Sequence, residues 1–384
     1  MTASRRLSRA ETTAYLGLFC VGLYVTSFGP ALPFIARENG VGLGTAGIVL
    51  TALSAGSITA SAVVSLRLAR VDASVLTAIG LVICAAGLSI LSLGLSLPAT
   101  LAACALAGIG DGLVVASTHS LVTVASDDVP RGINRLNIMF ALGAIAGPMW
   151  TGVALEESGE LVLPYVGLSA FLVLAAAFAW LTPRSGTPGE EHLTVRLNPA
   201  VVLMGLILFF YVGAEFGLGA WVSSYTEQAA DASIVAGAAV SSGYWGALAV
   251  GRFLTGSLLG RHAPAPLLGV AIGGAFAAGV ALVFLGDVLA LAFAAALVTG
   301  LAFGPIWPLS MAIGTRDAGG STTAALVTAG NSGAIVFPAL QGAILAGTGP
   351  QEGVAVTPVL CLIMMGLLIT HSRAERTLPD TIEA

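Results

Sequence analysis

Residues 200–222 read AVVLMGLILFFYVGAEFGLGAWV, and this stretch carries a single charged residue, Glu215. A helix needs about 20 consecutive apolar residues to cross the hydrocarbon core of a bilayer, which is about 30 Å thick. This run therefore predicts a membrane-spanning helix. Its continuous apolar character argues against a strand of a membrane barrel, in which lipid-facing and lumen-facing residues would alternate over roughly ten positions.

Comparable stretches recur along the whole chain with short connections between them. Only 9% of the 384 residues are charged and 57% are hydrophobic, which leaves too few charges to cover a water-facing globule of this length. We therefore expect an all-α integral membrane protein with twelve transmembrane helices. The predicted spans are 14–36, 45–68, 73–96, 100–124, 134–155, 161–182, 200–222, 234–259, 265–286, 288–311, 321–346 and 356–372.

The arginines predict the orientation of these helices. All 15 cationic side chains are arginines, and with both chain ends in the cytoplasm only Arg37 falls on the outer side. Cytoplasmic loops of membrane proteins are enriched in Lys and Arg, so this distribution favours that orientation. We expect a multi-pass protein of the inner (plasma) membrane with both termini cytoplasmic. The first apolar stretch lacks a small-residue cleavage site, so it is expected to be a retained helix.

The second half of the chain weakly repeats the first. GAIAGPMWTGVAL at 143–155 and GAIVFPALQGAIL at 333–345 share six of thirteen positions at a constant offset of 190. An offset of half the chain predicts two parallel six-helix halves, with a substrate site near the midplane where they meet. The polar stretch at 183–198 is then a cytoplasmic linker between an N-terminal bundle, 1–182, and a C-terminal bundle, 199–384.

Ionisable groups inside the spans are functional candidates because a charge at the bilayer centre costs about 2.5–3.5 kcal/mol on insertion scales. Glu215 could bind a polar substrate, carry a coupling proton, or both; alternatively it is a hydrogen-bonded packing group. Asp111 and His119 wind along one side of the same predicted helix and could form a proton relay. The plainer alternative is that His119 bonds a backbone carbonyl.

Aromatic and amide residues near these groups form a candidate binding cavity. Aromatic faces combined with amides and hydroxyls suit a sugar, whose ring has apolar C–H patches edged by hydroxyl groups. Taken singly, each aromatic residue is more often a packing residue or an interfacial anchor. The candidate substrate-binding residues are Glu215, Tyr211, Trp221, Tyr225, Trp245, Trp307, Asn137, Asn331 and Gln341, and Trp150 belongs to the same set.

Four arginines at the predicted cytoplasmic side are candidates for gating, through pairs with acids or helix ends. Arg252 and Arg261 lie near the end of the eighth predicted helix, and Arg67 and Arg70 occupy the related place after the second. The four cysteines fall singly inside apolar stretches without a CxxC pair, so we interpret them as small buried hydrophobic residues. We expect no metal and no cofactor.

At these residues the chain resembles the major facilitator superfamily and, within it, the fucose/galactose/glucose:proton symporter family. YVGAE at 211–215 is similar to the family's helix-seven motif, YWGALAVGRFLTGSLLGRHAP at 244–264 to its helix-eight pattern, and GLAFGPIWP at 300–308 to its helix-ten stretch. The resemblance implies the major facilitator fold, with two pseudo-symmetric six-helix bundles, and proton symport of a hexose or related sugar by alternating access.

Two positions depart from that family's pattern. Thr26 and Ser27 occupy the region of its helix-one carboxylate, and Val115 and His119 stand where its helix-four pattern has an acid and an asparagine. Asp111 lies one turn earlier on roughly the same side. Glu215 is therefore the leading candidate for proton coupling.

The leading prediction is thus a monomeric secondary transporter that lies in membrane lipid and moves a small polar solute together with a proton. A proton antiporter for efflux of drugs or metabolites is the alternative, because GxxxGP at Gly143–Pro148 resembles an antiporter motif. A nutrient sensor that does not transport also stays open. We do not expect an enzyme, since HExxH, GxSxG and phosphate-loop motifs are missing. The dispersed arginines do not form a nucleic-acid surface.

Overall fold

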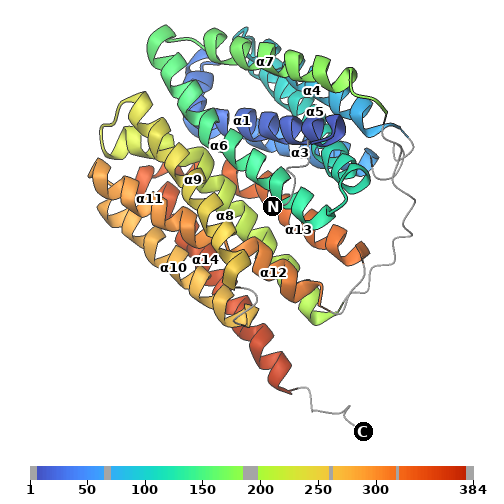
Figure 1. Cartoon of the computed structure of the whole chain (residues 1–384). Helices are drawn as coiled ribbons and strands as arrows, with labels where there is room; N and C mark the ends of the chain where they lie inside the picture. The colour runs from blue at the N-terminus through green and yellow to red at the C-terminus, as the bar shows by residue number, and fades with distance from the viewer. Residues whose placement is uncertain (1–6, 65–70, 185–197, 259–262, 317–319, 378–384) are drawn as a thin grey trace, which may run out of the picture.

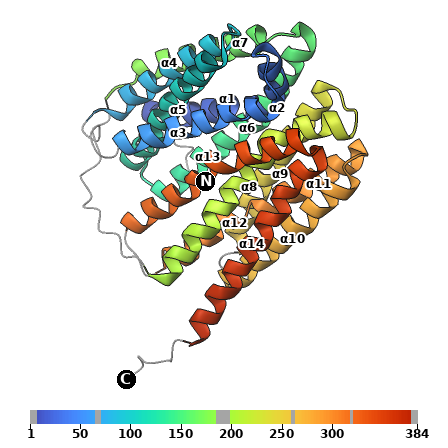
Figure 2. The ribbon, with the colours of Figure 1, turned by 180° about the vertical axis from the view of Figure 1, so that it is seen from behind.

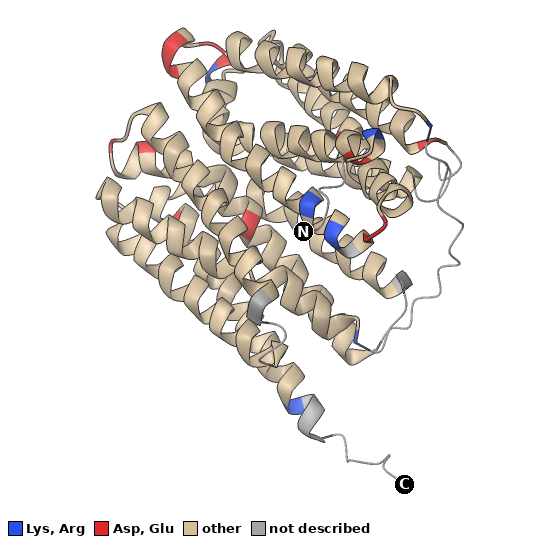
Figure 3. Ribbon diagram, viewed as in Figure 1, with Lys and Arg blue, Asp and Glu red and all other residues tan. Residues whose placement is uncertain are grey.

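The chain is a bundle of long helices in the computed structural model, which describes residues 7–64, 71–184, 198–258, 263–316 and 320–377 (Figure 1). The described residues contain 12 stretches that are long and apolar enough to cross a membrane. The prediction of twelve transmembrane helices is therefore confirmed. Most charged residues lie at the two ends of the bundle (Figure 3).

The helices fall into two consecutive sets, which occupy opposite sides of the molecule in both views (Figures 1 and 2). The first set is α1 (Arg9–Glu38), α2 (Leu43–Ala46), α3 (Ile48–Val63), α4 (Ala73–Leu91), α5 (Leu97–Ala125), α6 (Val129–Ser158) and α7 (Val162–Trp180). The second set is α8 (Pro199–Ala229), α9 (Ile234–Leu258), α10 (Pro264–Leu285), α11 (Leu289–Phe303), α12 (Ile306–Gly314), α13 (Gly320–Gly347) and α14 (Pro350–Thr377). We call these sets the N half and the C half. Most of the expected linker lies outside the described residues.

Helix ends and breaks differ from the predicted spans for local reasons. The first helix starts at Arg9 rather than residue 14 because Ser8 and Glu11 form a capping box, in which each side chain accepts a hydrogen bond from the other's backbone N–H. Two spans predicted as continuous helices are each divided in two. One is interrupted at Gly47, between α2 and α3, and the other before Ile306, where Pro305 has no N–H to donate to the preceding turn.

The sequence repeat corresponds to the same helix contact in each half. Gly143 on α6 lies against the backbone carbonyl of Phe19 on α1, and Gly333 on α13 lies against the backbone carbonyl of Phe209 on α8. Both members of the second pair are 190 residues after those of the first, which is the offset of the repeat. Small residues at these positions let the helix backbones approach closely.

The two halves meet tightly at the end of the bundle that carries the α1–α2 and α8–α9 connections, which we call the sealed end. There the Trp221 ring of α8 lies against Gly47 of the N half and Gly342 of α13, and its indole N–H donates to the Pro338 carbonyl at 2.7 Å. Gly44 packs against α13 nearby, at Ala346. A single large side chain thus fills the space between small ones.

Two hydrogen bonds join the halves across this interface. The Thr51 hydroxyl of α3 donates to the Ile335 carbonyl of α13 at 2.7 Å. The backbone N–H of Val235, in the first turn of α9, donates to the Glu156 carboxylate of α6 at 2.9 Å. An acid from one half therefore satisfies a free N–H at the start of a helix in the other half, where the helix dipole also favours negative charge.

Candidate functional site

A pocket lies between the two halves, with walls from α1, α3, α8, α9 and α13. The space that the centre of a water molecule can reach inside it is ≈ 40 Å³. Its lining is uncharged, and its polar side-chain groups are two hydroxyls and one indole N–H. The lining residues are Val25, Thr26, Gly29, Leu50, Leu53, Ser54, Phe216, Gly219, Ala220, Trp245, Ala334 and Pro338.

Trp245, which lines this pocket, has an unused hydrogen-bond donor. Its ring packs against Gly219 and edge-on against Phe216, with 5.6 Å between the ring centroids. The indole N–H is buried and has no hydrogen-bond partner among the described residues. Nearly all buried polar groups in proteins are paired, so an unpaired donor beside a pocket is a place where a ligand acceptor would be stabilised.

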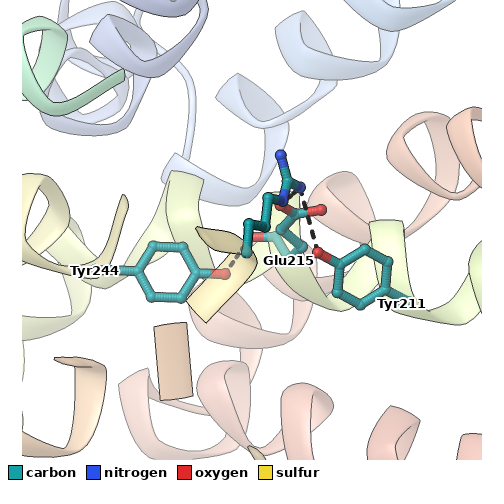
Figure 4. Close-up of polar contacts among 4 residues, drawn as sticks. Tyr211, Glu215 and Tyr244 are labelled. Atoms are coloured by element: carbon teal, nitrogen blue, oxygen red, sulfur yellow. Dashed lines mark hydrogen bonds and ion pairs between the residues drawn. The ribbon is translucent and has the colours of Figure 1, made fainter. Parts of the chain in front are cut away.

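Glu215, the residue before the lining residue Phe216 on α8, forms a buried ion pair (Figure 4). Its side chain is only 2% exposed, and one carboxylate oxygen accepts a hydrogen bond from Arg252 Nη2 at 2.6 Å. The same nitrogen lies 3.4 Å from the Tyr211 hydroxyl, and the Tyr244 hydroxyl donates to the Glu215 backbone carbonyl at 2.9 Å. Glu215 is therefore paired with a cation, so its charge is compensated inside the bundle.

Arg252 faces the interior of the protein rather than lipid. The exposed apolar residues Val250, Phe253 and Leu254 mark the lipid-facing side of α9. At about 100° per residue, Arg252 points about 200° away from Val250, on the opposite side of the helix. Its side chain is still 31% exposed, and its Nε is buried with no hydrogen-bond partner among the described residues. The guanidinium group therefore keeps a donor that the Glu215 pair does not satisfy.

A second buried acid, Asp111, lies in the N half. The Tyr24 hydroxyl of α1 donates to one carboxylate oxygen at 2.6 Å, and the Ser57 hydroxyl of α3 donates to the other at 2.5 Å. Both oxygens are held by neutral donors. Asp111 is 8% exposed, so this carboxyl group is nearly enclosed.

The two polar clusters use related helices for some members, although Asp111 lies on the fourth membrane span of the N half and Glu215 on the first span of the C half. Ser57 follows Gly56, which packs against the backbone of α5, just as Arg252 follows Gly251, which packs against the backbone of α11. Tyr24 and Tyr211 lie on the first helix of each half. Ser57 was not among the residues predicted for the site, but the repeated Tyr-Val dipeptide at 24–25 and 211–212 is a signal that could have pointed to Tyr24.

Three other predicted site residues, His119, Tyr225 and Trp221, make polar contacts with backbone carbonyls. His119 Nδ1 contacts the Val115 carbonyl of its own helix at 2.8 Å, and it is about 12 Å along the helix axis from Asp111, so the two do not form a direct relay. The Tyr225 hydroxyl donates to the Leu282 carbonyl at 2.6 Å. Trp221 belongs to the sealed end, and neither aromatic residue has a donor left for a substrate.

Of the remaining candidate residues, some are buried inside the bundle and others are exposed. Trp307 packs against the Tyr211 ring, and Gln341 is fully buried with no partner for either amide atom among the described residues. Asn137 and Asn331 are exposed. Trp150 donates to the Pro164 carbonyl within the N half, and it is 43% exposed, so it does not line the pocket. The candidate gating residues Arg67, Arg70 and Arg261 lie outside the described residues.

Among curated proteins the similarities are short. A segment of 64 residues is 38% identical to Bypass of stop codon protein 6 of Saccharomyces cerevisiae and covers 17% of this chain and 13% of that protein. A segment of 115 residues is 28% identical to a putative glucose/galactose transporter of Helicobacter pylori and covers 29% of this chain and 28% of that protein. The matches therefore span less than a third of these relatives' length.

Solved structures match over nearly the whole chain at low sequence identity. A bacterial homolog of the human lysosomal transporter Spinster, in an inward-facing and unoccupied conformation, has a TM-score of 0.79 at 14% identity and covers 95% of this chain and 96% of that chain. The nucleoside transporter NupG has a TM-score of 0.73 at 13% identity, covering 97% and 99%. These likenesses establish the fold.

The family is established by sequence. The family model of the Major Facilitator Superfamily matches residues 14–338, which is most of the chain and includes both halves. The twelve helices, the repeated contact in the two halves and the pocket between them agree with that match. The chain belongs to the Major Facilitator Superfamily and is a membrane transporter rather than an enzyme.

Proposed function

We propose that this transporter is a proton-coupled symporter for a small polar solute of the sugar class. The observation that carries the proposal is the pocket shared by both halves, whose lining includes Trp245 with its unpaired indole N–H, and the ion pair of Glu215, the residue before the lining residue Phe216 on α8. The local similarity to a putative glucose/galactose transporter supports the sugar class. An indole ring offers both an apolar face and a donor to a sugar ring.

Alternating access follows from the way the halves are arranged. We propose that residues 1–182 and 199–384 rock as two bundles around the pocket, with both chain ends in the cytoplasm of the cell that carries the protein in its inner membrane. The sealed end then faces outward. One chain supplies both walls of the pocket, which supports a monomer as the working unit.

The proton role of Glu215 is tested by the Glu215→Gln variant in liposomes, with an imposed pH gradient, no sodium and a panel of labelled hexoses and hexose derivatives. We expect the native protein to accumulate its solute uphill. The variant loses this accumulation but keeps exchange, because the amide cannot take up a proton. Glu157→Gln, on the exposed end of α6, is the control. Normal accumulation by Glu215→Gln would exclude the proton role.

The sealed end is tested with a disulfide between Gly44→Cys and Ala346→Cys. A Cβ at position 44 would lie 3.0 Å from the Cβ of Ala346. If the two backbones move slightly apart, this Cβ–Cβ distance enters the usual disulfide range of about 3.5–4.5 Å. We expect oxidation to stop uptake and reduction to restore it, because this end must open during the cycle. The four native cysteines are buried, and the Gly44→Cys single variant is the control. Full activity of the cross-linked protein contradicts this expectation.

A second candidate function, efflux of an apolar compound by proton antiport, is favoured by the mainly apolar pocket lining, which includes Leu50, Leu53 and Phe216. The antiporter-like motif itself does not add to it. Gly143 and Gly147 pack against the backbone of α1, and Gly333 makes the corresponding contact in the C half. Labelled hexose uptake by whole cells, compared with their drug-resistance profile, distinguishes the two functions.

A further inference from the structure

The ion pair between Glu215 and Arg252 constrains the charge of the transported solute. In the structure the two charges cancel, at an N–O distance of 2.6 Å. A proton on Glu215 removes the negative charge and leaves Arg252 as an unpaired cation inside the bundle. A buried charge without a partner is strongly unfavourable. Symport of a proton with an uncharged hexose would therefore carry an uncompensated charge through the midplane.

We infer that the transported solute carries a carboxylate, which replaces Glu215 as the partner of Arg252 when Glu215 is protonated. The inference rests on the proton symport proposed above. One anion and one proton enter together, so the net charge of the site is zero before and after loading. The proton resides on the Glu215 carboxyl group, and the solute carboxylate accepts hydrogen bonds from the guanidinium group.

The geometry of Arg252 fits this exchange. A guanidinium group has five N–H donors in a planar fork and binds carboxylates in a bidentate manner. In the structure Nη2 contacts Glu215 and Tyr211, Nε is buried without a partner among the described residues, and the side chain as a whole is 31% exposed. Arg252 lies on the side of α9 opposite the lipid face, as does Trp245 two turns away. A solute that binds both residues would have its acid group at Arg252 and its remaining groups in the pocket.

The surroundings of Glu215 contain no other charge that could take this role among the described residues. The titratable groups near it are Tyr211 on its own helix, Arg252 and Tyr244 on α9, and Cys361 of α14 behind Tyr244. Arg252 is the only cation among these groups. The pocket lining adds Ser54 and Trp245, while the Thr26 hydroxyl already donates to the Gly22 and Ala144 carbonyls. This combination suits a sugar acid, with one carboxylate and several hydroxyl groups.

The experiment compares D-glucuronate, lactate and D-glucose in liposomes that contain the purified full chain, with an imposed pH gradient. We expect D-glucuronate to accumulate, and D-glucose uptake to be lower by about tenfold or more. Because one proton accompanies one anion, uptake of D-glucuronate is independent of an imposed membrane potential. A neutral solute carried with a proton would respond to that potential.

Arginine variants test the contact itself. We expect Arg252→Gln to weaken D-glucuronate binding by about tenfold or more, and Arg252→Lys to restore it only in part because an ammonium group lacks the fork. Binding is measured in the Glu215→Gln background, which leaves no unpaired carboxylate. Arg131→Gln is the matched control, since Arg131 pairs with Asp128 at a similar distance of 2.9 Å on an exposed surface.

Each outcome separates this inference from the proposed function. Accumulation of D-glucose without D-glucuronate overturns the carboxylate inference and leaves sugar symport intact. Uptake of lactate alone supports the carboxylate and contradicts the sugar class. Failure of both D-glucuronate and lactate overturns the carboxylate inference, and the hexose panel described above then tests sugar symport by itself. Potential-dependent uptake of D-glucuronate by the native protein also overturns the proposed charge balance, and this measurement needs no variant.

Discussion

The Arg252→Gln variant is expected to lose solute accumulation and about 3–5 kcal/mol of stability, because it leaves the buried Glu215 carboxylate without a cation. Removal of one partner from a buried ion pair costs far more than the net contribution of the pair itself, since the remaining charge is no longer compensated. Thermal unfolding of the purified protein and uptake in liposomes measure the two effects separately.

A second substitution shows whether the loss comes from that uncompensated charge. The double variant Arg252→Gln/Glu215→Gln has no charge left in the cluster, so we expect its stability to return close to that of the native protein while proton-driven uptake stays absent. The exposed pair Arg131–Asp128 is the control, because surface pairs contribute only about 0–1 kcal/mol. An Arg252→Gln protein as stable as the native one would contradict the buried ion pair.

The substitutions Gly143→Ala and Gly333→Ala are expected to lower the yield of folded protein sharply. A Cβ at Gly143 meets the backbone oxygen of Phe19, and a Cβ at Gly333 meets that of Phe209. Neither obstacle is a side chain that can rotate away, so the helices must separate. Overpacking of a tight interior costs about 1–3 kcal/mol, and we expect the upper part of that range here.

The matched control for these variants is Gly366→Ala in α14, where a Cβ meets nothing within 4 Å. Yield and melting temperature of detergent-extracted protein are compared across the three variants. Since the two contacts are related by the repeat, the two losses should be similar. Tolerance of either substitution at the level of Gly366→Ala would mean that the corresponding helices are less closely packed than the structure has them.

The fold could be predicted well from the sequence because its determinants are local. Each span is an apolar run of sufficient length, and the repeat at 143–155 and 333–345 identified a helix pair that packs in the same way in both halves. The interruptions at Gly47 and Pro305 were not predicted. In both spans the apolar character continues across the break, so hydropathy carries no sign of it.

The site could be predicted only in part. Glu215, Asp111 and Arg252 stood out because charges are rare in apolar helices, but the pairing of Glu215 with Arg252 depends on how α8 and α9 are rotated about their axes. That rotation is set by packing against neighbouring helices rather than by either sequence alone. Trp221 and Tyr225 were expected to bind a solute, and in the structure both donate to backbone carbonyls instead. In the sequence, an aromatic residue that packs looks the same as one that binds a solute.

The contacts at the sealed end affect both the turnover rate of this transporter and its leakage. One indole ring lies over Gly47 and Gly342, and the hydrogen bonds from Thr51 and Val235 connect the halves. The contacts that prevent leakage are therefore the same ones that must break in every turnover. Variants that fill the small-residue surface more completely should leak less and cycle more slowly, whereas variants that loosen it should do the reverse.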